Sequence, residues 1–204
     1  MEAVEAQNIT LAVTGASGSV YAVEMLRALV ADERVARVNL VVSESALRVF
    51  AEELGLSGRN ELVEKLLGAA AAKVEQHSDE NIGAAIASGS YPGGTMIVLP
   101  CSMGTLARVA HGLASNLIER AADVTLKERR RLVLCVRETP FNLIHLRNMT
   151  AAAEAGATIY PVMATLYNHP EDTTAMARQY VLRVLAHVGL AQPGMFTWGP
   201  LRGV

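Results

Sequence analysis

Residues 9–30 read ITLAVTGASGSVYAVEMLRALV, and this stretch indicates the fold class. Its first five residues, ITLAV, form a short and largely apolar run, as in a strand that is buried on both faces. Residues 14–18 are small and contain two glycines, which predicts a tight turn. Apolar side chains then recur at helical spacing between Val20 and Val30. The stretch therefore predicts a strand, a turn and a helix in that order.

The same alternation continues along the chain. Further apolar runs predict strands at residues 38–42, 96–99, 132–136 and 158–160, and Pro100 is expected to break the second of these. Helices are predicted at residues 43–54, 60–73, 116–129, 142–154 and 173–188, with another opening at residues 101–102 and a loop at residues 84–94. Strands that are apolar throughout and alternate with helices indicate a parallel sheet covered on both faces.

No repeat, linker or charge block divides the sequence. We therefore expect one doubly wound α/β domain over residues 1–190, followed by a short C-terminal tail over residues 191–204. Trp198, the only tryptophan, lies in this tail between glycine and proline residues. It either anchors the tail on the domain or closes over a ligand, so we expect the tail to pack near the site.

The composition narrows the class of protein. Of 204 residues, 51% are hydrophobic and 19% are charged, and the net charge is −2. So much apolar side chain excludes a disordered chain, and the net charge argues against a nucleic-acid binder that works by bulk electrostatics. The low charged fraction suggests that part of the surface is buried against other subunits, although an alanine-rich monomer fits the same composition.

Cysteine usage and hydropathy exclude further classes. Cys101 and Cys135 have no histidine at ligand spacing, so neither a zinc site nor a disulfide framework is expected, and no metal is predicted. The apolar runs are far shorter than the ~20 residues of a membrane span. The first seven residues, MEAVEAQ, do not resemble a signal peptide. We therefore expect a cytoplasmic protein.

Ligands of doubly wound sheets bind beyond the carboxyl ends of the strands. Here those ends are residues 15–18, Ser43, residues 100–105 and residues 137–140. Glycines and small hydroxyl residues recur there, which suits backbone amides that meet a phosphate at a helix N-terminus, although each turn alone also fits ordinary capping. The first turn lacks the full G-x-G-x-x-G spacing and specifies no dinucleotide. The pattern favours a phosphorylated ligand.

A charged pair, Arg137 and Glu138, directly follows a predicted strand. Such a pair is either a buried structural ion pair or a pair that faces the ligand crevice, and its position favours the second interpretation. The charge run at residues 127–131 is interpreted instead as the solvated end of a helix.

Four segments carry a family resemblance: TGASGS at 14–19, ASGS at 87–90, PCSMGTLARVAHG at 100–112 and NLIERAADVTLKERRRLVLCVRETPFNLIHLRNM at 116–149. They closely resemble the flavin prenyltransferase family, which includes bacterial UbiX and fungal Pad1 proteins. The resemblance runs from about Thr10 to Leu190 and continues weakly to Trp198. It implies a flavodoxin- or Rossmann-like domain with helices on both faces of the sheet, assembled as a homododecamer.

The resemblance also implies a reaction. The chain would join a dimethylallyl group, from dimethylallyl monophosphate or pyrophosphate, to N5 and C6 of reduced FMN without a metal. The product, prenylated FMN, would serve a UbiD-type decarboxylase as the recipient partner. Two alternatives stay open: an FMN-dependent cysteine decarboxylase of the same fold, and a flavin carrier without turnover. Residues 116–149 and Glu138 argue against the first, and the presence of Glu138, Lys127 and Arg183 argues against the second.

Site residues follow from the matching positions. Those implied to bind the flavin are Gly15, Ala16, Ser17, Ser43, Ser102, Met103, Gly104, Thr105 and Arg137. Those implied to bind the prenyl phosphate are Lys127, Tyr167 and Arg183, with Gly89, Arg120 and Trp198 near the site. The implied chemistry falls to Glu138, Ser17, Glu53 and Lys127, of which Lys127 could come from a neighbouring subunit and Glu53 could be exchanged with Glu52 by a one-residue slip.

One stretch departs from the family pattern. Members commonly read P-P-x-P-x-F-Y before the tyrosine, whereas residues 161–167 read PVMATLY. The tyrosine is kept but the loop differs, so the choice between monophosphate and pyrophosphate stays open.

Overall fold

The computed structural model describes residues 6–199; the first five residues of the expected domain and residues 200–204 of the expected tail lie outside the described residues. The strand, turn and helix predicted within residues 9–30 are present. The strands are β1 (Gln7–Val13), β2 (Val35–Val42), β3 (Val74–Ser78), β4 (Gly93–Cys101), β5 (Arg131–Val136) and β6 (Thr158–Ile159). The helices are α1 (Ser19–Ala31), α2 (Glu44–Leu54), α3 (Leu62–Leu67), α4 (Met103–Ala110), α5 (Leu117–Lys127), α6 (Leu143–Glu154) and α7 (Thr173–His187), with a 3-10 turn at Ala85–Ala87.

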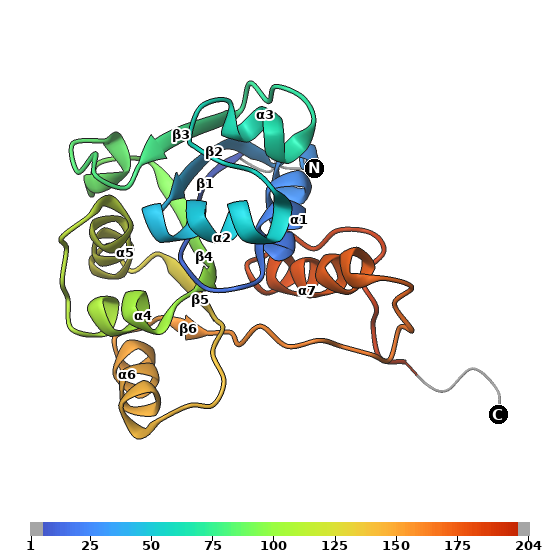
Figure 1. The fold of residues 1–204 in the computed structure, drawn as a ribbon. Coiled ribbons are helices and arrows are strands. Elements are labelled where there is room, and N and C mark those ends of the chain that lie inside the picture. The colour runs from blue at the N-terminus through green and yellow to red at the C-terminus, as the bar shows by residue number, and fades with distance from the viewer. Residues whose placement is uncertain (1–5, 200–204) are drawn as a thin grey trace, which may run out of the picture.

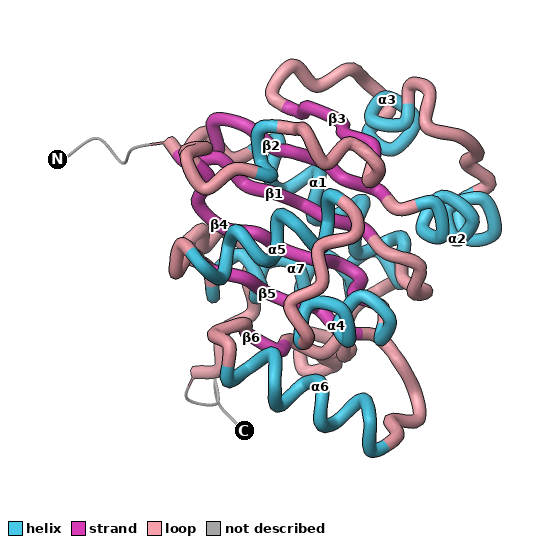
Figure 2. Tube along the Cα trace, turned by 90° about the vertical axis from the view of Figure 1, so that its left-hand side faces the viewer, coloured by secondary structure: helices cyan, strands magenta, loops and turns pink. Residues whose placement is uncertain are grey.

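The six strands form one sheet in the order β3-β2-β1-β4-β5-β6, and every neighbouring pair is parallel (Figure 2). This is the strand order of the Rossmann fold. The predicted doubly wound α/β fold is therefore confirmed. Because β1 lies between β2 and β4, the direction of chain winding reverses there, and the crevice for a ligand is expected beyond the carboxyl ends of β1 and β4.

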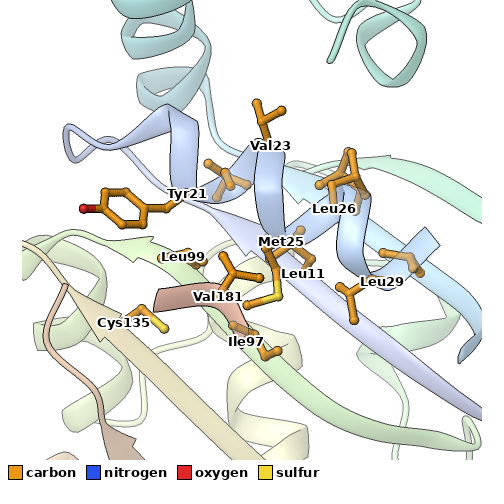
Figure 3. Close-up of a cluster of buried hydrophobic side chains, with 14 of the residues drawn as sticks. Leu11, Tyr21, Val23, Met25, Leu26, Leu29, Ile97, Leu99, Cys135 and Val181 are labelled. Carbon is orange, nitrogen blue, oxygen red and sulfur yellow. The ribbon is translucent and has the colours of Figure 1, made fainter. Parts of the chain in front are cut away.

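Helices cover both faces of the sheet. In Figure 1, α1 and α7 lie on one side, whereas α4, α5 and α6 lie on the other. Successive β1 side chains alternate between the two buried clusters: Leu11 and Val13 belong to the first and Ala12 belongs to the second. Figure 3 shows Met25 of α1 and Val181 of α7 beside Leu11 in the first cluster. Both faces of the central strands are thus covered by hydrophobic clusters, which explains why β1, β4 and β5 carry no alternating pattern.

The helix boundaries follow their capping residues. Ser43 caps α2, as predicted, and its hydroxyl accepts a hydrogen bond from the backbone of Ala46 at 3.1 Å. The helix ends at Gly55, which has a left-handed φ of 68°. The helix predicted at residues 60–73 is shorter: α3 ends at Leu67, because Gly68 terminates it in the left-handed conformation.

Two strand predictions were wrong. β3 was missed, because its sequence VEQHS is polar and only His77 in it is buried, as on the edge of a sheet. Pro100 does not break β4, which continues to Cys101. The register between β4 and β5 shifts between Val98 and Cys101, so the ladder does not need the N–H that proline lacks. The predicted loop at residues 84–94 contains a 3-10 turn and the first two residues of β4.

Candidate functional site

The carboxyl ends of β1 and β4 are joined where the winding of the sheet reverses. The Thr14 hydroxyl donates to the Pro100 carbonyl at 2.8 Å and accepts from the Ser102 backbone N–H at 2.8 Å. The first turn therefore has a fixed position relative to residues 102–105. These are two of the segments that the sequence predicts to hold the flavin.

The first turn also lies against the start of α2. A Cβ atom on Gly15 would come within 2.4 Å of the Ser45 hydroxyl, a separation that real Cβ atoms do not show. Only glycine allows this approach. The Ser45 and Ser43 hydroxyls lie 3.0 Å apart, so the first turn lies beside the hydroxyl groups at the N-terminus of α2.

Three helix N-termini converge beside these turns, those of α2, α4 and α5. Their N-caps are Ser43, Ser102 and Asn116, and each side chain accepts a backbone hydrogen bond from its own first turn. A cavity of about 510 Å³ lies among them. We call it the cradle, and its lining includes Ser43, Ser45, Arg48, Ser102, Thr105 and Arg108.

The cradle is suited to an anion. Helix N-termini carry partial positive charge, and two guanidinium groups, those of Arg48 and Arg108, add full charges. Three carboxylates also line the cavity, and each is paired with an arginine: Glu44 and Asp79 with Arg59, and Glu119 with Arg108. The Arg108 guanidinium lies 3.3 Å from Glu119, which is only 2% exposed and also accepts from the Ser115 N–H at 2.8 Å and the Asn116 amide at 3.0 Å. Arg48 makes no ion pair within residues 6–199. One phosphate would find hydroxyls, amides and cations here.

Sequence reasoning missed Ser45, Arg48 and Arg108. A usable signal was present. Each arginine follows a hydroxyl residue by three positions, Ser45 and Thr105 respectively, at the start of a predicted helix. Residues three apart lie on the same helix face, so each arginine belongs beside its hydroxyl.

Glu53 lies at the N-terminus of α1 rather than in the cradle. Its carboxylate accepts from the Ser19 N–H at 2.7 Å and from the Gly18 N–H at 3.1 Å to each oxygen. Burial raises the pKa of Glu53, but hydrogen bonds from the Ser17 hydroxyl and from these two amides lower it further than that, so the pKa lies below its ordinary value. Glu52 is exposed, and its side chain makes no hydrogen bond within the described chain.

Arg137 and Glu138 extend the end of β5. The Arg137 backbone N–H donates to the Cys101 carbonyl at 3.1 Å, which continues the ladder with β4. Both side chains are exposed, and among the described residues the Glu138 carboxylate accepts only from the backbone of Thr139, at 2.9 Å. Within residues 6–199 the two charges form no ion pair, so the buried-pair interpretation does not describe them.

A second, larger pocket of about 1110 Å³ brings together Tyr167, Arg183 and Trp198, three of the predicted substrate residues. The Tyr167 and Trp198 rings meet edge to face with centroids 5.1 Å apart, and Phe196 stacks on Tyr167 at 6.5 Å. The Phe196 N–H donates to the Gln179 side chain at 2.9 Å, which ties the segment around Phe196 to α7.

The structure does not bring every predicted residue to one place. Lys127 ends α5, four residues before β5 begins, and Gly89 lies four residues before β4 begins. Both therefore lie at the amino-terminal edge of the sheet, opposite the cradle, and a Cβ atom on Gly89 would come within 2.6 Å of the Lys127 ammonium. Arg120 also bonds this segment, donating to the Ala87 carbonyl at 3.1 Å.

No cluster of three or more potential metal ligands occurs in the part of the chain that the structure describes. Within the same residues, no helix is long and apolar enough to cross a membrane.

A doubly wound sheet with an anion-binding cavity at its switch point is typical of nucleotide-binding proteins. The family model described as Flavoprotein matches residues 2–186 of this chain. Flavin prenyltransferase UbiX of Alkalihalophilus pseudofirmus is 40% identical over 94% of this chain and 96% of that protein. The chain therefore belongs to the flavin prenyltransferase family of UbiX proteins.

Solved structures agree with this assignment. A dodecameric FMN-dependent UbiX-like decarboxylase from Escherichia coli O157:H7 is 38% identical and superposes with a TM-score of 0.85, over 95% of this chain and all of that one. AnUbiX (PadA1), in complex with FMN and dimethylallyl pyrophosphate, is 36% identical with a TM-score of 0.86, over 96% of this chain and 99% of that one.

Proposed function

We propose that this chain is a flavin prenyltransferase, which joins the dimethylallyl group of dimethylallyl monophosphate to N5 and C6 of reduced FMN. The observation that carries the proposal is the cradle, where three helix N-termini and two arginines meet in a chain that is 40% identical to a flavin prenyltransferase. FMN carries a single phosphate, and the cradle is a single compact anion site, so the two match in number.

In this proposal the FMN phosphate binds in the cradle, held by the hydroxyls of Ser43, Ser102 and Thr105 and by the charges of Arg48 and Arg108. The remaining predicted flavin residues would contact the rest of the molecule: Gly15, Ala16, Ser17, Met103, Gly104 and Arg137. The reduced flavin supplies the electron-rich N5 and C6 atoms.

The second pocket would hold the prenyl phosphate. Tyr167 and Arg183 line it, and the exposed rings around them would exclude water from the allylic carbon. Positive charge near the leaving phosphate stabilises the transition state, and each such contact is typically worth ~2–4 kcal/mol of barrier. We propose that residues 191–199 and Trp198 act as the wall of this pocket.

Glu138 would move the proton that leaves N5. The residue is exposed at the end of β5 and is bonded only to its own neighbour among residues 6–199, so its carboxylate is free to meet a ligand. An ionised Glu53 beside the Ser17 hydroxyl can accept a proton through that hydroxyl rather than donate one.

We propose a homododecamer, in which Lys127, Gly89 and Arg120 of one subunit complete the site of another. Support comes from the dodecameric relative and from apolar side chains that the single chain leaves uncovered around the start of α6: Phe141, Leu143, Ile144 and Leu146, of which Ile144 is 65% exposed. Exposed apolar groups of this kind mark interaction surfaces.

We further propose that prenylated FMN passes to a UbiD-type decarboxylase and that the protein works in the cytoplasm. Two free, buried cysteines are in keeping with a reducing compartment.

Mass spectrometry of the flavin tests the proposal. The protein is incubated anaerobically with reduced FMN and dimethylallyl monophosphate, and the flavin is then extracted. A mass gain of one dimethylallyl unit is expected. Unchanged FMN would reject prenyl transfer and favour a decarboxylase of the same fold or a flavin carrier.

A further inference from the structure

Arg59 lies in the segment between α2 and α3, and its side chain reaches back to the start of α2. The guanidinium donates to the Glu44 carboxylate at 2.8 Å and to the Asp79 carboxylate at 2.7 Å, and both of these residues line the cradle. It also donates to the Val42 carbonyl at the end of β2. One side chain therefore bridges acceptors at the ends of two neighbouring strands, β2 and β3.

The fold fixes the position of Arg59. Its backbone carbonyl accepts from the Gln76 side chain of β3 at 2.9 Å, and its own side chain is only 22% exposed. Asp79 is 9% exposed, and its backbone carbonyl accepts from the N–H of Leu117, the first residue of α5, at 2.7 Å. The ion pair of Arg59 with Asp79 thus joins ordered elements, and partly buried pairs are screened much less than exposed ones.

Without Arg59, the charges of the cradle would not favour an anion. Two arginines and three carboxylates line the cavity, so the lining alone carries one more negative than positive charge. Arg108 is paired with Glu119. Among residues 6–199, Glu44 and Asp79 are paired only with Arg59. Either carboxylate, left unpaired, would repel a phosphate in the same cavity, and such repulsion is several times stronger near a protein surface than in bulk water.

We propose that Arg59 is a positioning residue for the flavin phosphate, because it neutralises Glu44 and Asp79. The attraction of Arg48 and of the three helix N-termini then acts on the anion without opposition. Arg59 acts through the carboxylates that it holds, since its guanidinium is already bonded to three acceptors of the protein. This inference rests on the proposed function, because it concerns the FMN phosphate in the cradle.

Titrations with FMN and with riboflavin test this role, because riboflavin is the same flavin without the phosphate. Both dissociation constants are measured from flavin fluorescence on the full chain, for the wild-type protein, Arg59→Gln and the control Arg37→Gln. Arg37 also pairs with a glutamate, Glu75, but lies near the beginning of β2, whereas the cradle lies beyond the end of that strand. In Arg59→Gln the FMN dissociation constant should rise about 10–100-fold, and that of riboflavin should change less than about twofold. The control should keep the wild-type preference for FMN.

Neutral carboxylate variants separate charge from shape. Arg59→Gln is combined with Glu44→Gln and Asp79→Asn, so that no repelling charge remains in this part of the cradle. The preference for FMN over riboflavin should return to the wild-type range in this triple variant. If the preference stays low there, Arg59 only maintains the shape of the cavity, and the inference is wrong.

The outcomes also separate this inference from the proposed function. If the wild-type protein binds FMN no more tightly than riboflavin, the placement of the phosphate in the cradle is wrong, and the inference falls with it. If the wild-type protein prefers FMN and Arg59→Gln keeps that preference, or loses affinity for both flavins equally, only the role of Arg59 is wrong.

Should Arg59→Gln not fold, Arg59→Gln/Asp79→Asn decides in its place, because it removes the buried carboxylate that would otherwise lack a partner. Glu44 alone is then unpaired, and its side chain is largely exposed, so its repulsion is weaker. The preference for FMN should be about threefold lower in this double variant than in the triple variant. Equal preferences in the two variants would contradict the role of Arg59.

Discussion

The hydroxyl of Thr14 lies 2.8 Å from the backbone nitrogen of Ser102, and this hydrogen bond joins the turn after β1 to the N-cap of α4. Thr14 is only 2% exposed, and its hydroxyl also donates to the Pro100 carbonyl. One side chain therefore sets the spacing of the two segments between which we place the flavin. Neither segment can shift without breaking a buried hydrogen bond.

We expect Thr14→Val to weaken both the fold and flavin binding. Valine keeps the shape of threonine but leaves the Ser102 N–H without its partner, which typically costs about 1–3 kcal/mol. Chemical denaturation measures the loss, and an FMN titration should show weaker binding. Thr10→Val is the matched control in the same strand, because its hydroxyl makes no hydrogen bond within residues 6–199. Equal effects of the two substitutions would contradict this role.

Glu138→Gln should abolish prenyl transfer and spare FMN binding. Glutamine keeps the size of the side chain but cannot take up the proton, and loss of such a group typically lowers the rate ~10²–10⁴-fold. The rate of prenylated FMN formation and the FMN dissociation constant are measured on the same sample. Glu154→Gln, at the far end of α6, provides a control that should form product at the wild-type rate. Undiminished product from Glu138→Gln would remove this residue from the mechanism.

The strand-end turns could be predicted from sequence because their pattern is local. Ser43 and Ser102, which follow β2 and β4, each cap a helix within three residues of their own position, and capping leaves a direct mark on the sequence. β3 could not be found in the same way. An edge strand needs no continuous apolar run, so VEQHS resembles a loop until its partner β2 is known.

The position of Glu53 depends on the tertiary fold. Its carboxylate meets Gly18 and Ser19 across 35 and 34 residues of chain, respectively, between the end of one helix and the start of another. No local spacing encodes such a contact, and sequence alone left Glu52 and Glu53 interchangeable. The separation of Lys127 from the cradle likewise follows from the direction of α5, which carries the chain from one edge of the sheet to the other.

Asp32 should make stability depend on pH in the acid range. A side-chain hydrogen bond from Arg34 lowers the pKa of Asp32 from 3.8 to about 2, against the opposing effect of burial and with help from Gln192. A lowered folded-state pKa stabilises the fold above the unfolded value, and the gain of about 2 kcal/mol is lost as the pH falls from 3.8 to about 2. Asp32→Asn should remove this dependence.

Denaturation at several pH values measures the effect of Asp32. The exposed neighbour Glu33, changed to Gln, serves as the control and should keep the wild-type profile. Asp32 also accepts from Gln192 at 2.9 Å, so the variant should release residues 191–199 to faster hydrogen exchange. A wild-type acid profile in Asp32→Asn would contradict the assignment.

Mixed oligomers should show whether Lys127 serves a neighbouring subunit. In one chain Lys127 lies at the amino-terminal edge of the sheet, whereas Arg183 lines the pocket with Tyr167. Lys127→Ala and Arg183→Ala should each lose prenyl transfer. When the two are co-expressed in equal amounts, about one quarter of the sites would draw both residues from intact subunits, so activity should return to that level. The control mixture of Tyr167→Ala with Arg183→Ala should stay inactive, because both residues line the same pocket. If the first mixture stays as inactive as the control, Lys127 does not act across a subunit boundary.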